Sequence, residues 1–241
     1  MNHEVTTAHL SHPAYHRTRI KVCGLTREQD VDAAVEAGAD AIGFVLYPHS
    51  PRAVSAERAA ALAARLPPFV TPVLLFVNHD AAETLAALAR VPGAIAQFHG
   101  DETPAQCDAS TGNDRFRYLR AARIPLGLAG GAFDLVKYAT DFSHAQAILL
   151  DAHVDGFGGG GKAFNWSLLP LVVNAHLVLS GGLSPANVGD GIRTLRPRCK
   201  SLAVDVSSGV EVSKGIKDAS KIRDFVAAVR AADATITPPS C

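Results

Sequence analysis

Short apolar runs alternate with helical patterns along almost the whole chain, and this alternation constrains the fold more than any other feature. Each apolar run is only a few residues long, and a stretch with helical periodicity follows most of them. Strands that alternate with helices form parallel sheets, because each connection between parallel strands has to cross a face of the sheet. The sequence therefore predicts an α/β protein.

The pattern divides the chain into eight strand-helix units. The predicted strands are residues 19–23, 40–46, 72–77, 94–98, 116–121, 147–150, 177–179 and 202–206, with 124–128 as an alternative fifth strand. The predicted helices are 26–37 with Thr26 as N-cap, 55–66 with Ser55 as N-cap, 80–90, a short one within 101–114, one near 132–138, and one after each of the last three strands, the final one being 219–232.

Eight units between residues 19 and 233 occupy about 27 residues each, the usual scale of a strand-helix repeat. No linker separates two halves. The spacing favours one closed (β/α)8 TIM barrel over an open doubly wound sheet. Residues 1–18 and 234–241 are predicted to be flexible tails.

Composition limits the possible partners. The chain has 23 Lys and Arg against 23 Asp and Glu, which is not the basic footprint of a nucleic-acid or membrane-surface protein. No apolar stretch approaches the ~18 residues of a membrane span, and residues 1–19 lack the apolar core of a secretory signal. No C-x-x-C or other metal-ligand spacing is present. We expect a cytoplasmic protein with a small-molecule ligand, no metal and no cofactor.

Reactive side chains cluster at the predicted strand ends, where the active sites of barrel enzymes lie. Cys23 ends the first strand and Asp151 follows the sixth, so the two can meet at one rim as a base and an acid. A thiol base acts best with its pKa lowered from ~8.5, and a carboxylic acid donor with its pKa raised from ~3.9. The competing interpretation is that Cys23 is only a small buried apolar residue.

Glycine-rich turns after the last three strands predict a phosphate site. They are Gly158 to Gly161, Ser180-Gly181-Gly182 and Ser207-Ser208-Gly209. Glycine lets backbone N–H groups approach an anion, and barrels often bind phosphate with the loops after strands 7 and 8 and a short extra helix, which here could begin within 209–213. Lys162 could add positive charge.

Two further loops carry candidate groups. Arg52, in the proline-stiffened loop after the second strand, could hold a substrate carboxylate through two hydrogen bonds. His99 and Asp101 could form a metal or acid-base pair, although a histidine at a strand end is more often structural.

In combination and order, these motifs resemble the phosphoribosylanthranilate isomerase family of tryptophan biosynthesis, whose members are (β/α)8 barrels. The resemblance covers roughly residues 19–232. It rests on Lys21-Val22-Cys23-Gly24-Leu25-Thr26, on residues 44–52 (FVLYPHSPR), on 97–102 (QFHGDE), on Leu150-Asp151, on 158–166, on 179–183 (LSGGL) and on 204–211 (VDVSSGVE).

The resemblance implies an Amadori rearrangement of N-(5-phosphoribosyl)anthranilate to 1-(2-carboxyphenylamino)-1-deoxyribulose 5-phosphate without a cofactor. It assigns the general base to Cys23, the general acid to Asp151 and the anthranilate-carboxylate clamp to Arg52. It places Asp205 near the substrate. The implied phosphate-binding residues are Gly160, Gly161, Gly181, Gly182, Ser207, Ser208 and Gly209. Two positions depart from the family pattern, since Gly160 replaces a threonine and Asn165 an aspartate.

Three alternatives stay open at the level of sequence. Lys21 could form a Schiff base in an aldolase-like lyase, although it lies deeper in the barrel than Cys23 and an unpaired ammonium there is costly. The barrel could bind a sugar phosphate without turning it over. It could also be the histidine-pathway sugar isomerase, a family that resembles this one in fold but has an aspartate where Cys23 stands. The oligomeric state is predicted as monomer or homodimer.

Overall fold

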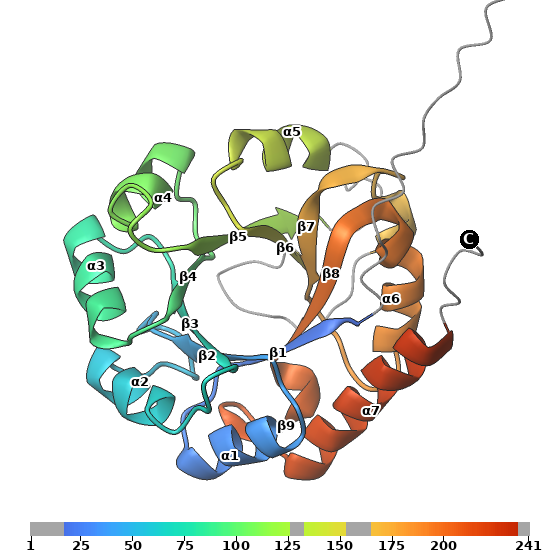
Figure 1. Cartoon of the computed structure of the whole chain (residues 1–241), viewed down its shortest axis with the longest axis horizontal. Coiled ribbons are helices and arrows are strands. Elements are labelled where there is room, and N and C mark those ends of the chain that lie inside the picture. Colours follow the sequence, from blue (N-terminus) through green and yellow to red (C-terminus); the bar gives the residue numbers. More distant parts are fainter. Residues whose placement is uncertain (1–16, 126–132, 153–164, 236–241) are drawn as a thin grey trace, which may run out of the picture.

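The computed structural model describes residues 17–125, 133–152 and 165–235. In this part of the chain eight strands form a closed ring with helices around it (Figure 1). The barrel strands are β1 (Arg19–Cys23), β2 (Ala41–Val45), β3 (Thr71–Phe76), β4 (Ile95–Phe98), β5 (Tyr118–Ile124), β6 (Ala147–Ala152), β7 (Val173–Leu179) and β8 (Cys199–Val206). The helices are α1 (Glu28–Glu36), α2 (Ala56–Ala63), α3 (Ala81–Arg90), α4 (Pro104–Ser110), α5 (Leu135–Asp141), α6 (Val188–Leu195) and α7 (Ala219–Thr235).

Every strand of the barrel pairs in parallel with its neighbours in the sequence, and β8 closes the ring on β1. The register places Lys21 beside Asp205 and Cys23 beside Gly43. The predicted single (β/α)8 barrel is confirmed. A closed barrel leaves no sheet edge, and all strands end at the same rim.

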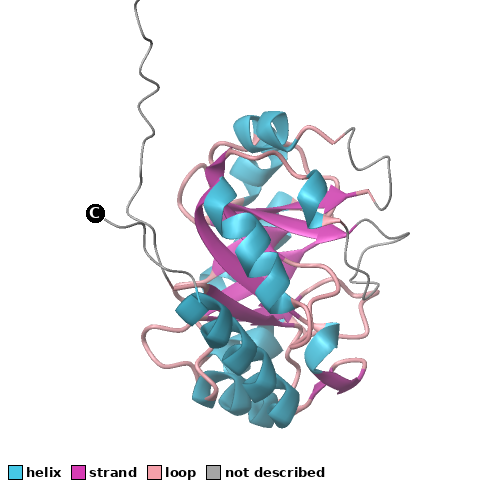
Figure 2. Cartoon of the chain, turned by 90° about the vertical axis from the view of Figure 1, so that its right-hand side faces the viewer, coloured by secondary structure: helices cyan, strands magenta, loops and turns pink. Residues whose placement is uncertain are grey.

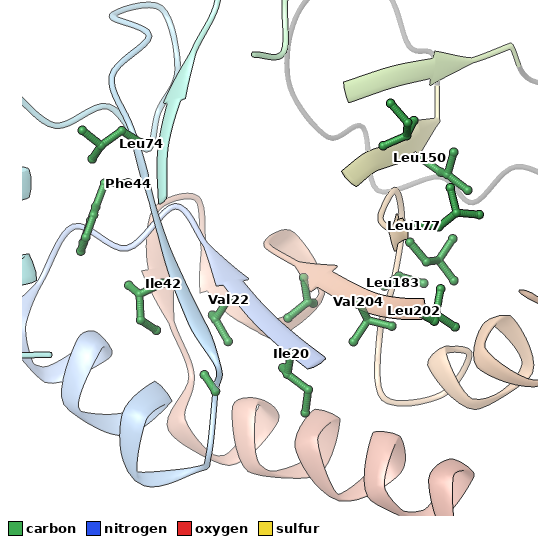
Figure 3. Packing of buried hydrophobic residues seen from close by; sticks show 14 of the residues in the cluster. Ile20, Val22, Ile42, Phe44, Leu74, Leu150, Leu177, Leu183, Leu202 and Val204 are labelled. Carbon is green, nitrogen blue, oxygen red and sulfur yellow. The ribbon is translucent and has the colours of Figure 1, made fainter. Parts of the chain in front are cut away.

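Strand alternation sends successive side chains to opposite sides of the barrel wall. Ile20 and Val22 on β1 belong to the large apolar layer between strands and helices, and Figure 3 shows Ile20 directed toward α7. Lys21 and Cys23, the residues between and after them, lie on the inner side. Two small apolar clusters, one of them around Leu149, fill the barrel interior. The wall is thus apolar on its outer face, while its inner face can carry polar groups near the rim.

Helix caps agree only in part with the sequence prediction. Ser55 caps α2, its side chain accepting a hydrogen bond from the Arg58 N–H. Thr26 does not cap α1, which begins at Glu28; its hydroxyl instead donates to the Gly215 carbonyl at 2.9 Å. A contact between residues 189 positions apart thus replaces the local cap.

The later units also differ from the prediction. Strand β5 includes the first candidate from position 118 and extends to Ile124, and α5 begins three residues later than expected. Between β6 and β7 the described residues form only a 3-10 turn, Trp166–Leu168, in place of a helix. After β8, the expected short helix is the 3-10 turn Ser208–Val210, followed by a hairpin of β9 (Glu211–Ser213) and β10 (Ile216–Lys217). Figure 2 shows this hairpin at the end of the barrel where the strands finish.

A polar cluster joins the two ends of the described barrel. Thr18 is fully buried, and its hydroxyl donates to Asp233 of α7 at 2.5 Å. Arg196 donates to the same aspartate at 2.6 Å and to the Thr18 hydroxyl. These contacts fix the start of β1 against the last helix, so Thr18 is part of the packed barrel.

Candidate active site

A pocket opens at the carboxyl ends of the strands and contains most of the residues selected from the sequence. The predicted residues that line it are Cys23, Arg52, Asp151, Gly181, Gly182, Asp205, Ser207 and Ser208. Its apolar wall is formed by Val45, Leu75, Val77 and Leu183, with Tyr47, Ser50, Gln97, His99 and Ser180 completing it. The eight predicted residues come from β1, β6, β8 and the loops after β2, β7 and β8, so only closure of the ring brings them together.

A buried ion pair lies beside Cys23. The Lys21 ammonium donates to Asp205 Oδ1 at 2.8 Å, and both side chains are about 5% exposed. Ser180 donates to the other Asp205 oxygen at 3.3 Å. Burial lowers the pKa of Lys21, but the Asp205 carboxylate and the Cys23 sulfur together outweigh burial, and the pKa is raised. Lys21 is therefore a paired, charged group, which argues against a Schiff-base lysine.

The Cys23 thiol is buried at the base of the pocket. Burial raises its pKa, because a thiolate is poorly solvated there, and the nearby Lys21 charge acts in the opposite direction. The net shift is upward, opposite to the lowering that favours a thiol base at neutral pH. A thiolate formed here is a correspondingly strong base.

Across the pocket, Asp151 is held by hydrogen bonds. Its Oδ2 lies 3.0 Å from His99 Nε2, and its Oδ1 accepts from the Ala152 N–H at 3.0 Å. The other ring nitrogen of His99 is 3.1 Å from Gln97 Nε2. His99 therefore pairs with Asp151 and not with Asp101, which is on the surface and forms an ion pair with Arg123. The His99–Asp101 pair, which the sequence analysis considered but did not favour, does not form.

Arg52 forms a second ionic network at the rim. Its Nε and Nη2 donate to the two Glu211 carboxylate oxygens at 2.7 and 2.8 Å. Lys217, whose side chain is fully buried, donates to Glu211 Oε1 at 2.9 Å and to the Ser207 carbonyl at 3.0 Å. Burial lowers the pKa of Lys217. This network links the loop after β2 to the loop after β8.

The glycines of the last two loops are required by close backbone approaches. A Cβ on Gly181, whose φ is +78°, would lie 2.6 Å from the Ala152 backbone nitrogen. A Cβ on Gly209 would lie 1.9 Å from the Leu183 carbonyl oxygen, so the loops after β7 and β8 touch at this point. Gly209 thus packs against the loop after β7 and is not among the residues that line the pocket.

The structure adds residues that sequence reasoning had passed over and leaves two predicted residues undescribed. Gly160 and Gly161, with Lys162, fall outside the described residues. Glu211, Lys217, Gln97 and the His99–Asp151 contact were missed. Gln97 and Glu211 stand within the segments that resemble the family, and this was the one sequence signal for them; Lys217 had none. Among the described side chains, no group of three His, Cys, Asp or Glu could hold a metal ion. No helix in the same part of the chain is long and apolar enough to cross a bilayer.

The chain has a closed (β/α)8 barrel and a pocket with reactive side chains at the carboxyl ends of its strands. This combination is typical of barrel enzymes. Residues 20–228 match the family model described as N-(5′-phosphoribosyl)anthranilate (PRA) isomerase. The chain belongs to this family, and it is an enzyme that isomerises N-(5′-phosphoribosyl)anthranilate in tryptophan biosynthesis.

Individual relatives agree with the family model. The N-(5′-phosphoribosyl)anthranilate isomerase of Methylibium petroleiphilum is 64% identical over 220 residues, which are 91% of this chain and 97% of that protein. The crystal structure of phosphoribosyl anthranilate isomerase from Thermotoga maritima has a TM-score of 0.76 and 38% identity, covering 89% of this chain and 99% of its own. A phosphoribosyl anthranilate isomerase in complex with reduced 1-(o-carboxyphenylamino)-1-deoxyribulose 5-phosphate has a TM-score of 0.71 and 34% identity, with the same coverage.

Proposed function

We propose that Cys23 and Asp151 carry out the Amadori rearrangement of N-(5-phosphoribosyl)anthranilate as general base and general acid. The observation that carries the proposal is that both residues line one pocket, together with Arg52 and the glycine-rich loops after β7 and β8. The product is 1-(2-carboxyphenylamino)-1-deoxyribulose 5-phosphate, and the complex of the solved relative with the reduced form of this product supports the assignment.

Two proton transfers account for the reaction. Asp151 protonates the furanose ring oxygen, the bond from this oxygen to C1 breaks, and the anthranilate nitrogen supplies the electron pair that forms the iminium. The Cys23 thiolate then removes the C2 proton, and the C2–H electrons form the enolamine, which tautomerises to the ketone. His99 keeps the Asp151 carboxyl directed into the pocket through its 3.0 Å contact. The residues supply proton transfer and orientation, and the proposal assigns no cofactor.

The two charged ends of the substrate are assigned to different loops at the rim of the pocket. The phosphate is assigned to the loops after β7 and β8, at Gly181, Gly182, Ser207 and Ser208. Gly209 is assigned to the same site, where it lets the two loops pack together. Gly160 and Gly161 remain a prediction. The anthranilate carboxylate is assigned to Arg52. Glu211 uses the edge of the guanidinium formed by Nε and Nη2, so the edge formed by Nη1 and Nη2 offers the two parallel donors that a carboxylate accepts.

Asp205 is proposed to lie near the reacting carbons, because it borders the pocket beside Cys23 while its carboxylate holds Lys21. The chain is proposed to act in the cytoplasm, as a monomer or homodimer, with this phosphorylated small molecule as its ligand and neither nucleic acid nor membrane as partner.

The test is an assay with freshly prepared phosphoribosylanthranilate, following the loss of anthranilate-type fluorescence in the wild type, Cys23→Ala and Asp151→Ala. Each variant should lower kcat by about 10²- to 10⁴-fold, the usual contribution of a general acid or base, with native circular dichroism. Wild-type kcat in a folded variant would remove that residue from the mechanism. Sodium borohydride added during turnover should trap no adduct on Lys21.

A further inference from the structure

The inner wall of the barrel holds a lysine that the two proton transfers do not use. Lys21 is two residues before Cys23 on β1, on the same face of the strand and deeper in the barrel. Its side chain is 5% exposed, and it is bound to a carboxylate that is equally buried. A buried ion pair contributes little to stability compared with an apolar pair of the same size, so its presence beside the proposed base calls for another explanation.

Gly43 leaves space beside its backbone that the Lys21 ammonium and the Cys23 sulfur both adjoin. It is the partner of Cys23 across β1 and β2, and a Cβ on it would lie 2.7 Å from Cys23 Sγ and 3.0 Å from Lys21 Nζ. Both atoms therefore lie within 3.0 Å of one point above the glycine. The ammonium is close to the sulfur on one side and bound to Asp205 on the other.

We propose that Lys21 is a positioning residue for the Cys23 base: its ammonium, held in place by Asp205, stabilises the thiolate that accepts the substrate proton. This inference rests on the proposed role of Cys23. The lysine acts through the sulfur and does not itself touch the reacting carbons. After proton transfer the sulfur is a neutral thiol, and Lys21 and Asp205 remain as a compensated pair.

The other charges around the thiol fit this role. Asp205, from β8, disfavours the thiolate, whereas Lys217, from β10, favours it. Arg52, from the loop after β2, interacts with the Cys23 charge, but Glu211 neutralises much of the Arg52 and Lys217 charge. His99, after β4, and Asp151, on β6, line the same pocket. Lys21 is thus the cation best placed to offset burial of the thiolate.

The experiment measures the reactivity of the thiolate directly. The full chain is treated with iodoacetamide between pH 6 and pH 10, and peptide mass spectrometry gives the alkylation rate of each cysteine. Lys21→Met should slow Cys23 alkylation at pH 8 by about tenfold or more and move its pH profile to higher pH, since a shift of one pKa unit changes the thiolate fraction tenfold. Cys199, half-buried at the start of β8, is the control in the same sample and should react at an unchanged rate.

Asp205→Asn supplies the opposite change. It removes the negative charge of Asp205, which opposes the Cys23 thiolate, and the positive charge of Lys21 is then no longer neutralised by a carboxylate. Cys23 alkylation should therefore become faster, and its pH profile should move to lower pH. If Lys21 had only a structural role, Lys21→Met and Asp205→Asn would both loosen the packing around Cys23, and both would speed its alkylation. An unchanged Cys23 profile in Lys21→Met, or shifts in the same direction in both variants, overturns the proposal. If Lys21→Met does not fold, a profile that does not move to lower pH in Asp205→Asn overturns it.

The result does not depend on turnover. A wild type that fails to isomerise phosphoribosylanthranilate would contradict the proposed roles of Cys23 and Asp151, whereas the alkylation profiles test the Lys21 effect alone.

Discussion

The two walls of the pocket differ in how their buried charged groups are paired. On the wall formed by β1, β8 and the β9–β10 hairpin, every buried charge faces an opposite charge: Lys21 with Asp205, and Arg52 and Lys217 with Glu211. On the wall formed by β4 and β6, Asp151 is held by a histidine ring and a backbone N–H. The first wall is ionic, whereas the second holds its carboxyl group without a lysine or an arginine.

This difference suggests which wall carries which step. A thiolate needs positive charge nearby, and the ionic wall supplies it. A cation beside a carboxylic acid favours loss of its proton, and no Lys or Arg side chain lines the pocket on the Asp151 wall. Variants on each wall test the comparison.

The largest effect is expected from Asp151→Asn, which keeps the size of the side chain but removes its proton. We expect kcat to fall by about 10²- to 10⁴-fold. The residual kcat/KM should rise about tenfold per pH unit between pH 6 and pH 8, because the raised pKa of Cys23 makes the thiolate scarce over this range and only the thiol then titrates. A flat profile in Asp151→Asn would contradict the assignment of the base.

Lys217→Met tests the ionic wall through stability. It removes charge-assisted hydrogen bonds to Glu211 and Ser207, while Arg52 still holds the Glu211 carboxylate. We expect a loss of about 1.5–3 kcal/mol in the free energy of unfolding, measured by denaturant titration. Lys137→Met, which breaks an exposed ion pair with Asp141, is the control and should cost under about 0.5 kcal/mol. Equal losses in the two variants would mean that burial adds nothing to this network.

Arg52→Ala should act on binding more than on turnover. A carboxylate clamp holds the ground state and the transition state alike, so KM should rise by roughly ten- to a hundredfold while kcat changes little. Arg52→Lys should restore only part of the affinity, because an ammonium cannot pair with Glu211 and a substrate carboxylate through two flat edges. An unchanged KM in steady-state kinetics would refute the clamp.

The smallest effect is expected from His99→Ala, which leaves the acid in place but removes its partner. Loss of orientation should lower kcat by about tenfold with KM nearly unchanged, in line with a group that positions the Asp151 carboxyl. His176→Ala is the matched control, because His176 contacts Ser201 Oγ away from the pocket and its loss should not affect kcat. A kcat for His99→Ala equal to that of the control would leave Asp151 oriented by the Ala152 N–H alone.

The sequence predicted local structure well where apolar periodicity was strong. The first four strands and the first three helices lie within a few residues of their predicted bounds. Prediction failed where distant contacts override local preference. The Thr26 hydroxyl binds Gly215 and does not cap its own helix.

What the sequence determined by itself is the barrel, eight of the residues that line the pocket and the family they resemble, because period-two and helical patterns and short glycine motifs are local properties of the chain. Only the tertiary structure decided the partners: His99 with Asp151, Glu211 between Arg52 and Lys217, and Lys21 between Asp205 and Cys23. The physical reason is that a hydrogen bond or ion pair depends on distances between atoms, and ring closure brings together strands up to 184 residues apart in the sequence.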